Sequence, residues 1–499
     1  MTGDPVNGGS VNGGSVNGGD EICRLPATEL VRQIRGGHLS PLEVTDAVLA
    51  RMERLDPLLH AFCTPTPELA RAQATRVGDK IARGEPVGPL AGVPIGVKDL
   101  IATKGVRTAM GSPAYREFVP DEDDVAVERI LAADAVMLGK TNVPELGYSG
   151  VGHSPISATT RNPWHLEMTS GGSSAGSGAA VASGLGPAAL GSDGGGSVRI
   201  PAAHCGIYGF KGSMGRIPLY PGCRDERYPG VSSWESLEHL GPMTRTVADA
   251  ALLMSVLAGP DPRDRHSLPA GDVDWLGSVS DAGDGTGIAG LRVAFSPDLG
   301  YLAVDPEVRE IAGRAAAVFE KDLGCVVSPG DPGWSDPFEA FWSLVASDTD
   351  LVGMRAMAHT HGPAMSPHLV EMLRRPWTAE QLTTAGMTRK AVVNRMWRFM
   401  ADYDLFLTPT LAVPPFPVHM QGPEIIDGRF VPATSWLGFT FPINMTGQPA
   451  ATVPAGFTSA GLPVGLQIVG RHLADGTVLR ASAAFEAAAP WAHVWPALG

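Results

Sequence analysis

The sequence predicts an α/β protein in which helices pack against a central β-sheet. Candidate strands and helices alternate along most of the chain, which is typical of folds that place sheet and helices in separate layers. Hydrophobic residues make up 44% of the 499 residues, which is enough to bury a large core. Large α/β proteins of this length often form one unit, so we expect a single main folded domain.

The N-terminal residues predict a tail that is not part of the fold. Residues 5–9, 10–14 and 15–19 each end in Val-Asn-Gly-Gly. Such steps cost much entropy to order and bury little apolar surface. We therefore assign residues 1–20 to a disordered tail and residues 21–499 to the folded domain.

Helix signals follow directly after the tail. Residues 27–35 predict a short helix that ends at Gly36-Gly37. Ser40-Pro41-Leu42-Glu43 matches a capping box with proline at the first helical position, so a second helix begins there. The apolar residues of this helix recur at helical spacing, namely Val44, Val48, Met52 and Leu55.

A buried strand is expected within residues 90–101. Val93, Ile95 and Val97 alternate with other residues, and Lys98 follows directly. This pattern predicts an apolar strand that carries a lysine at its end. The neighbouring Asp99 should point away from Lys98, because successive side chains on a strand face opposite sides.

The alternation of elements continues to the C-terminus. Further helices are expected at residues 124–133, 177–183, 244–257, 306–321 and 477–488. Further strands are expected at residues 135–139, 188–191, 291–296, 403–408 and 464–470. Residues 260–290 form a polar connection, and the proline-rich residues 409–432 should lack regular structure.

Charge and composition exclude several classes of partner. The net charge is −14, so neither nucleic acid nor an anionic membrane is expected as a partner. No apolar run reaches the roughly 20 residues of a membrane helix, and no signal peptide is visible, so a cytoplasmic location is expected. The five cysteines form no CxxC pair, which argues against a disulfide framework or a zinc site.

The glycine- and serine-rich residues 170–201 carry the candidate chemistry. Gly194, Gly195 and Gly196 precede Ser197, and three glycines let backbone N–H groups converge close to a ligand. Convergent N–H groups beside a hydroxyl are the parts of an oxyanion hole with a nucleophile. The Ser197 hydroxyl still needs a base to remove its proton.

Lysine is the best candidate for that base. None of the thirteen histidines lies in a recognisable triad motif, and His204 follows Ser197 too closely to fold back onto it. A lysine buried on an apolar strand can have its pKa lowered enough to act as a base, and Lys98 has that setting. Ser173 lies in a second glycine-rich turn and is suited to relay the proton between them.

These motifs resemble the amidase signature family. Lys98-Asp99, Gly171-Gly172-Ser173-Ser174-Ala175-Gly176 and Gly194-Gly195-Gly196-Ser197 occur in the family's order, and Ser197 follows Ser173 by 24 positions, as in the family. Further matching segments are Ile200-Pro201-Ala202-Ala203, Gly209-Phe210-Lys211, residues 444–450 and residues 461–467. The resemblance extends from about residue 21 to residue 495.

The resemblance implies a central twisted mixed β-sheet flanked by helices on both faces, with a role for each motif residue. Lys98 resembles the base, Ser173 resembles the relay serine that follows a cis peptide bond, and Ser197 resembles the nucleophile. The oxyanion hole would use the N–H groups of Gly194, Gly195, Gly196 and Ser197. The supporting residues would be Ser174, Ser192, Asp193 and Arg199.

The function implied by the resemblance is amide-bond hydrolysis through an acyl-enzyme. The implied substrates are small or aryl amides, extending to anilides, esters and carbamates, as for an aryl acylamidase or a urethanase. The resemblance implies no metal or organic cofactor, and it allows for a homodimer. An A-type subunit of a glutamine-dependent tRNA amidotransferase shares the motifs and remains an alternative, as does a non-catalytic scaffold of the same fold.

Three positions depart from the common pattern of the family. Ala175 stands in place of a glycine, Ser192 in place of threonine and His204 in place of phenylalanine. The first two changes are conservative in size, whereas His204 is expected to alter the packing beneath the site or the substrate pocket. Residues 172–176 also match the G-x-S-x-G elbow of α/β hydrolases, but residues 161–169 do not read as the strand that this elbow requires.

Residues 330–440 are expected to be the variable part that shapes the substrate pocket. Eight Met and Trp residues cluster here, and each is expected to pack in the core: Met354, Met357, Met365, Met372, Trp377, Met387, Met396 and Trp397. As a group, they offer an adaptable apolar lining for a pocket. Cys223 lies in a loop near the signature and is expected to be structural, with the pocket entrance as the other reading.

Overall fold

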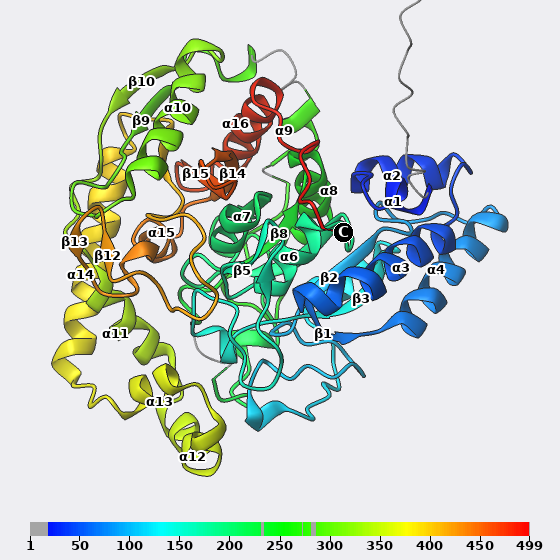
Figure 1. Cartoon of the computed structure of the whole chain (residues 1–499), viewed down its shortest axis with the longest axis horizontal. Helices are drawn as coiled ribbons and strands as arrows, with labels where there is room; N and C mark the ends of the chain where they lie inside the picture. The colour runs from blue at the N-terminus through cyan, green and yellow to red at the C-terminus, as the bar shows by residue number, and fades with distance from the viewer. Residues whose placement is uncertain (1–17, 231–233, 272, 281–285, 499) are drawn as a thin grey trace, which may run out of the picture.

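The computed structural model describes residues 18–230, 234–271, 273–280 and 286–498. A mixed sheet of 11 strands runs through the centre, with helices on both faces, as predicted (Figure 1). In spatial order its strands are β1 (Phe62–Pro65), β3 (Val136–Thr141), β2 (Pro94–Lys98), β6 (Ala188–Ser192), β8 (Leu240–Thr244), β7 (Tyr208–Lys211), β14 (Ala450–Phe457), β15 (Pro463–Gly470), β11 (Leu405–Pro409), β9 (Arg292–Phe295) and β10 (Val326–Pro329).

Two neighbouring parallel strands place the predicted catalytic segments together. β2 runs parallel to β6, with Val97 opposite Leu190. The carboxyl ends of the two strands therefore lie at one edge of the sheet, which brings Lys98 close to Ser192, the last residue of β6. On its other side β6 pairs with the antiparallel β8, and the loop before β8 reaches the same edge.

Alternating strand side chains divide the core into two layers. In β11, Leu405 and Leu407 belong to one cluster of buried side chains, whereas Phe406 belongs to the other. The first layer is covered by α2 (Ala27–Arg35), α5 (Val125–Ala132), α8 (Val247–Leu257), α10 (Pro306–Lys321) and α16 (Asp475–Ala488). The opposite face carries α3 (Pro41–Leu59), α4 (Pro67–Ala82), α6 (Ala175–Ala182), α7 (Arg199–Cys205) and α15 (Phe441–Thr446).

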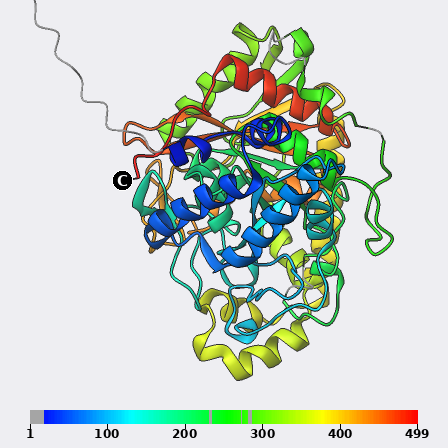
Figure 2. The same cartoon turned by 90° about the vertical axis from the view of Figure 1, so that its right-hand side faces the viewer.

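A further group of helices lies outside α15 and closes one end of the molecule. It consists of α11 (Phe338–Asp348), α12 (Leu351–His361), α13 (Pro367–Arg374) and α14 (Ala379–Phe399). Figure 1 shows these helices in yellow and yellow-green at the lower left, and α12 and α13 project at the bottom of the molecule in Figure 2. This group forms most of the segment that we expected to be variable.

The remaining elements are short. They are α1 (Gly18–Ile22), α9 (Gly277–Ser280), the strand pairs β4 (Arg161–Asn162) with β5 (His165–Thr169) and β12 (Ile425–Ile426) with β13 (Arg429–Phe430), and the 3₁₀ turns at Pro113–Tyr115, Glu145–Gly147, Gly222–Arg224, Thr286–Ile288, Gly362–Ala364 and Ser435–Leu437.

Several local signals in the sequence predicted their elements correctly. α2 and α10 have the expected bounds. The capping box of α3 is formed, because the Ser40 hydroxyl accepts the N–H of Glu43 at 3.1 Å and the Glu43 carboxylate accepts the N–H of Ser40 at 2.8 Å. β2 is buried at every position and ends at Lys98, as the alternation indicated.

The structure corrects the predictions in three segments. Residues 161–169 form the β4–β5 hairpin, with Asn162-Pro163 at its turn. This hairpin is a separate two-stranded sheet, so Ser173 does not follow a strand of the main sheet. Residues 240–244 form β8, whereas the helix predicted from residue 244 begins at Val247. The proline-rich segment 409–432 contains β12 and β13.

The boundary of the tail also differs from the expected one. Residues 1–17 lie outside the described residues, but α1 already begins at Gly18. The Asp20 carboxylate pairs with Arg51 at 2.8 Å and with Arg54 at 2.7 Å, and both arginines belong to α3. These two ion pairs dock the end of the predicted tail onto the folded domain.

Candidate active site

A cavity opens where β2 and β6 end. Its empty volume, including the opening to solvent, is about 930 Å³. Ser173, Ser192 and Ser197 are among the residues that line it, together with Gly194 and Gly195. The structure thus brings the separated glycine- and serine-rich motifs to one wall of one cavity.

Lys98 lies behind this wall and is fully buried. Its Nζ atom is 2.8 Å from the Ser173 hydroxyl, 2.8 Å from the Ser192 hydroxyl and 3.2 Å from the Ser192 carbonyl oxygen. Burial disfavours the charged ammonium and lowers the pKa of Lys98 to about 8, while the nearby carboxylates of Glu238 and Asp193 act against this shift. A lysine in this environment has an appreciable neutral fraction near physiological pH.

Asp99 faces the other side of β2, as the strand geometry predicts. Its charge interacts with Lys140 and it bonds to the thiol of Cys63, whereas burial raises the pKa of Asp99 to about 6. Lys98 therefore has no ion pair with its sequence neighbour.

Ser173 follows a cis peptide bond from Gly172. Gly172 approaches the backbone of Val151 so closely that a Cβ on residue 172 would lie 2.7 Å from the Val151 carbonyl oxygen. The backbone N–H of the next residue, Ser174, donates to the Ser197 carbonyl at 3.3 Å. This bond joins the Ser173 turn to the Ser197 turn directly.

Ser197 lies just before α7 and is partly exposed to the cavity. Within the described residues, no hydrogen bond joins the Ser197 hydroxyl to the Ser173 hydroxyl, although both line the same wall. The link between Lys98 and Ser173 is therefore formed in this structure, and the link between Ser173 and Ser197 is not.

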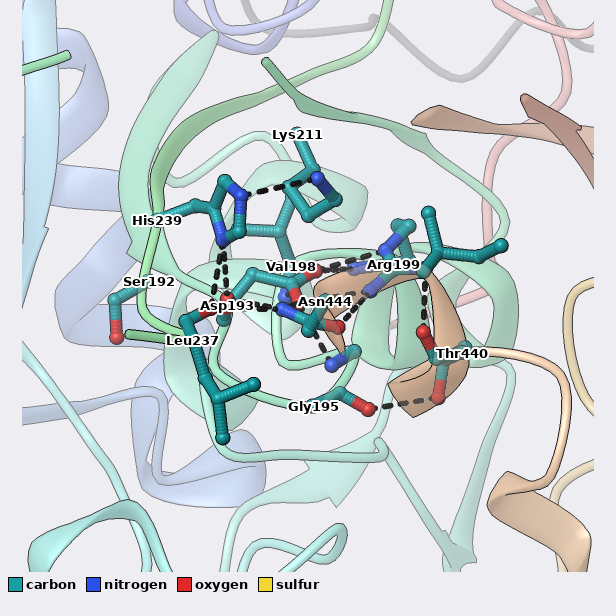
Figure 3. Close-up of polar contacts among 12 residues, drawn as sticks. Ser192, Asp193, Gly195, Val198, Arg199, Lys211, Leu237, His239, Thr440 and Asn444 are labelled. Carbon is teal, nitrogen blue, oxygen red and sulfur yellow. Dashed lines mark hydrogen bonds and ion pairs between the residues drawn. The ribbon is translucent and has the colours of Figure 1, made fainter. Parts of the chain in front are cut away.

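A buried carboxylate holds the loop between β6 and α7 in shape (Figure 3). The Asp193 carboxylate accepts the N–H of Gly196 at 2.7 Å and the N–H of Val198 at 3.2 Å. It also pairs with the Arg199 guanidinium at 2.9 Å, with both side chains fully buried. Although burial acts in the opposite direction, the charge and hydrogen bonds of Arg199 hold the pKa of Asp193 well below its usual range.

This network changes the expected set of oxyanion-hole donors. The Gly195 carbonyl accepts the Thr440 hydroxyl at 2.8 Å, and the Gly196 N–H of the same peptide unit donates to Asp193. Both ends of that peptide unit are thus engaged, and the Gly196 N–H points to the carboxylate instead of the cavity. The N–H groups of Gly194, Gly195 and Ser197 remain as candidate donors, which corrects the prediction for Gly196.

The other predicted supporting residues hold the same wall together. The Ser174 hydroxyl donates to the Ser192 carbonyl at 3.2 Å and accepts the Ser192 N–H at 3.3 Å. The Arg199 guanidinium bonds to Asn444 at 2.6 Å and to Gln467 at 2.6 Å. Asn444 and Gln467 were missed as individual residues, although the segments that carry them belong to the resemblance to the family.

Aromatic rings form a wall of the cavity. Trp234 packs against Tyr148, with ring centroids 4.8 Å apart, and against Phe341 of α11 at 6.0 Å. Phe338, Trp342 and Phe441 complete this wall. α11, which lies within residues 330–440, contributes side chains to the lining, whereas none of the eight clustered Met and Trp residues lines the cavity.

Those eight residues have other places in the structure. Met354 and Met396 are fully buried in the core between the helices, whereas Met387 and Trp397 are 62% and 55% exposed. Cys223, in contrast, does line the cavity. Glu238 also lines it and had not been singled out, because a lone glutamate in a loop carries no motif.

The described residues contain no cluster of three or more His, Cys, Asp or Glu side chains placed to hold a metal ion. Among the same residues, no helix combines the length and the apolar character that crossing a bilayer requires.

Known proteins are similar to this chain along nearly its whole length. Residues 43–479 match the family model described as Amidase. An acylamidase of Rhodococcus erythropolis is 39% identical, over 95% of this chain and 97% of that protein. The structure of a bacterial aryl acylamidase of the amidase signature family superposes with a TM-score of 0.86 at 33% identity, covering 94% of this chain and 97% of that one.

A second kind of relative has a different activity. The A-type subunit of the glutamyl-tRNA(Gln) amidotransferase from Geobacter metallireducens is 33% identical, over 94% of this chain and 98% of that protein. Both kinds of relative match this chain along nearly its whole length. The chain therefore belongs to the amidase signature family of amide hydrolases.

Proposed function

We propose that this protein hydrolyses small aryl amides, including anilides and aryl carbamates, through an acyl-enzyme on Ser197. The observation that carries the proposal is the 2.8 Å contact between the buried Lys98 amine and the Ser173 hydroxyl, at the wall of the cavity that Ser197 also lines. A base, a relay and a nucleophile are thereby available in a single site.

In the proposed acylation step, each proton that is transferred has a named donor and a named acceptor. Neutral Lys98 takes the proton of the Ser173 hydroxyl while Ser173 takes the proton of Ser197, whose oxygen attacks the substrate carbonyl. The N–H groups of Gly194, Gly195 and Ser197 stabilise the negative oxygen that develops. The proton then returns through Ser173 to the leaving nitrogen, the carbon–nitrogen bond breaks, and an ester to Ser197 remains.

Deacylation uses the same groups, with water in place of the Ser197 hydroxyl as the attacking group. Water gives its proton through Ser173 to Lys98 and attacks the Ser197 ester. Collapse of this second tetrahedral intermediate returns the proton to the Ser197 oxygen and releases the acid. A carbamate substrate follows the same steps and releases a carbamic or carbonic acid fragment.

The aromatic wall favours aryl substrates. Rings that pack at centroid distances of 4.5–7 Å gain roughly 0.5–1.5 kcal/mol beyond the burial of their area. Trp234, Phe341 and Trp342 present such rings to the cavity. The same wall offers little to the polar side chain of glutamine, which distinguishes this proposal from the amidotransferase alternative.

The decisive experiment combines turnover with trapping. We expect Ser197→Ala to lower kcat/KM for a nitroanilide about 10⁴-fold or more. Intact-mass analysis of the wild-type enzyme mixed with a nitrophenyl ester should show an acyl adduct, and peptide mass mapping should locate it on the peptide that contains Ser197. Ser255→Ala, on α8 and outside the cavity, serves as the matched control and should retain full activity.

Two results would contradict the proposal. Retained turnover in Ser197→Ala would place the nucleophile elsewhere. A purified chain that hydrolyses glutamine only when further subunits are added, and no nitroanilide, would favour the amidotransferase alternative.

A further inference from the structure

Glu238 places an acidic group in the cavity beside the proposed nucleophile loop. A Cβ on Gly194 would collide with the Glu238 carboxylate, so this carboxylate lies directly against the Gly194 backbone. Glu238 lines the cavity and retains partial contact with solvent. The mechanism proposed above assigns no role to this residue.

The backbone around Glu238 is held firmly. His239 and Asp193 exchange two backbone hydrogen bonds, at 2.7 and 3.2 Å. The Leu237 carbonyl accepts the Asn444 side chain at 3.2 Å, and the Glu238 N–H donates to the Trp234 carbonyl at 2.8 Å. Figure 3 shows Leu237 and His239 bonded into the Asp193 network, while Ser192 lies apart from that network. Glu238 is therefore presented to Ser192 from a rigid support.

Ser192 connects Glu238 to Lys98. The Ser192 hydroxyl is 2.8 Å from the Lys98 Nζ atom. Burial raises the pKa of Glu238, whereas the charge of Lys98 and the nearby Ser192 hydroxyl act in the opposite direction and favour the ionised carboxylate. The charges facing Lys98 are Glu238 and Asp193, and those facing Glu238 are Lys98, Asp193 and Arg224. Asp193 pairs with Arg199, and Arg224 pairs with Asp264 at 2.9 Å, so Glu238 and Lys98 are the charges left to balance each other.

Lys98, Ser192 and Glu238 follow one another in space, and the donors and acceptors that each offers determine which way the hydrogen bonds between them can run. A neutral lysine amine has two N–H donors and one lone pair. The Ser192 carbonyl oxygen can only accept a hydrogen bond, so one N–H of Lys98 donates to it. The Ser192 hydroxyl can either accept the second N–H or donate to the lone pair. An ionised carboxylate can only accept, so any hydrogen bond between Glu238 and Ser192 is donated by the Ser192 hydroxyl. The Ser192 oxygen is then left as an acceptor for an N–H of Lys98.

We propose that Glu238 is a positioning residue that, through Ser192, keeps the lone pair of Lys98 directed at the Ser173 hydroxyl and supplies the counter-charge of this base. The inference rests on the function proposed above, because it assumes that Lys98 is the base. Without Glu238, the Ser192 hydroxyl is free to donate to Lys98, which would turn an N–H of the lysine toward Ser173 and block the relay.

The negative charge of Glu238 should also affect the pH dependence of the rate, in a direction that can be stated. A negative charge near Lys98 stabilises its protonated form and so raises its pKa, which moves the acidic limb of the rate profile to higher pH. Removing the charge while keeping an acceptor should therefore move this limb to lower pH. Removing the acceptor as well should lower the rate on the alkaline plateau.

The test uses Glu238→Gln, Glu238→Ala and Glu238→Asp in the full-length enzyme. We expect Glu238→Gln to shift the acidic limb of kcat/KM for a nitroanilide down by about one pH unit and to keep the plateau within about tenfold, since its amide oxygen still accepts from Ser192. Glu238→Ala should lower the plateau by about 10²-fold, and Glu238→Asp should restore part of it. Glu226→Gln is the control, because Glu226 is an exposed carboxylate in the same connection between β7 and β8, and it should leave the profile unchanged.

The rate at which a sulfonyl fluoride labels Ser197, measured against pH, separates the role of Glu238 from the proposed function. Wild-type enzyme that is not labelled at Ser197 would overturn the proposed function itself. Wild-type labelling with the same pH dependence in every Glu238 variant would overturn only the role of Glu238. A loss in Glu238→Ala that is equal at all pH values, with no limb shift in Glu238→Gln, would mean that the residue is merely structural; thermal unfolding of each variant shows whether it is folded.

Discussion

At the scale of single residues, His204 shows how a departure from the family pattern is accommodated. Its ring stacks on Trp436, with centroids 5.5 Å apart and an interplanar angle of 8°, and its Nε2 atom lies 3.4 Å from the Val413 carbonyl. Within the described residues the Nδ1 atom has no hydrogen-bond partner. Burial lowers the pKa of His204 to about 3, so the ring is neutral and packs beneath the site as an aromatic residue would.

We expect His204→Phe to reduce the loss of stability in acid. The unfolded chain binds a proton at His204 below its ordinary pKa of 6.5, whereas the folded chain does not until about pH 3, so this group stabilises the fold at neutral pH and costs stability as the pH falls. Between pH 7 and pH 5 the cost is about 2 kcal/mol, and His204→Phe should remove it.

Urea unfolding at the two pH values measures the difference. Substituting the exposed His38 by Asn should leave the acid dependence as in the wild type. An unchanged loss of stability in His204→Phe would show that the imidazole is protonated in the folded protein.

At the scale of elements, the loop between β6 and α7 depends on one carboxylate. Asp193 accepts backbone N–H groups from this loop and neutralises Arg199, which in turn reaches Asn444 and Gln467. A glycine-rich loop has no side chains of its own to hold its shape, so its conformation comes from these bonds. The geometry of the proposed oxyanion hole thus depends on a residue that is expected to touch no substrate.

We expect Asp193→Asn to lower both stability and activity. The substitution leaves the Arg199 charge buried without its counter-charge, which costs about 3–5 kcal/mol in the free energy of unfolding. It should also lower kcat more than it raises KM, because the loop supports the transition state. Chemical denaturation and steady-state kinetics measure the two effects. The exposed pair of Glu310 with Arg314 on α10 supplies the control, since Glu310→Gln should change either quantity little.

At the scale of the whole molecule, the cavity lies between the carboxyl edge of the sheet and the layer of helices that begins with α11. The sheet edge carries the serines and the lysine, and the helix layer carries Phe338, Phe341 and Trp342. Proposed chemistry and proposed substrate preference therefore reside on different layers, which lets one change while the other stays constant. The two classes of relative named above share the fold in keeping with this division.

We expect Phe341→Ala to weaken binding of aryl substrates selectively. Loss of this ring should raise KM for a nitroanilide about tenfold, equivalent to about 1.4 kcal/mol, and should change kcat/KM for a short aliphatic amide much less. Kinetics on both substrates test this, with the exposed Met387→Ala on α14 as the control. Equal losses on both substrates would show that Phe341 supports the fold instead of the substrate.

The sequence by itself determined the elements with strong local signals and the motif residues. The capping box at Ser40, the alternating strand that ends at Lys98, and the two glycine-rich turns could be located because each depends on neighbours along the chain. Local signals did not predict β8, because a short strand depends on its partner strand. They also did not predict the β4–β5 hairpin, because the turn residues at Asn162 argued against a strand there.

Only the tertiary structure decided how these parts work together. It directed the Gly196 N–H to Asp193, placed rings of α11 in the same cavity as Ser197, and excluded the clustered methionines from that cavity. It also brought Glu238 to Ser192 and Lys98. Two properties depend on groups that are distant in sequence: the charge balance around the buried Lys98, and the direction of the hydrogen bonds that Lys98 makes. These groups meet only when the sheet and its loops have folded.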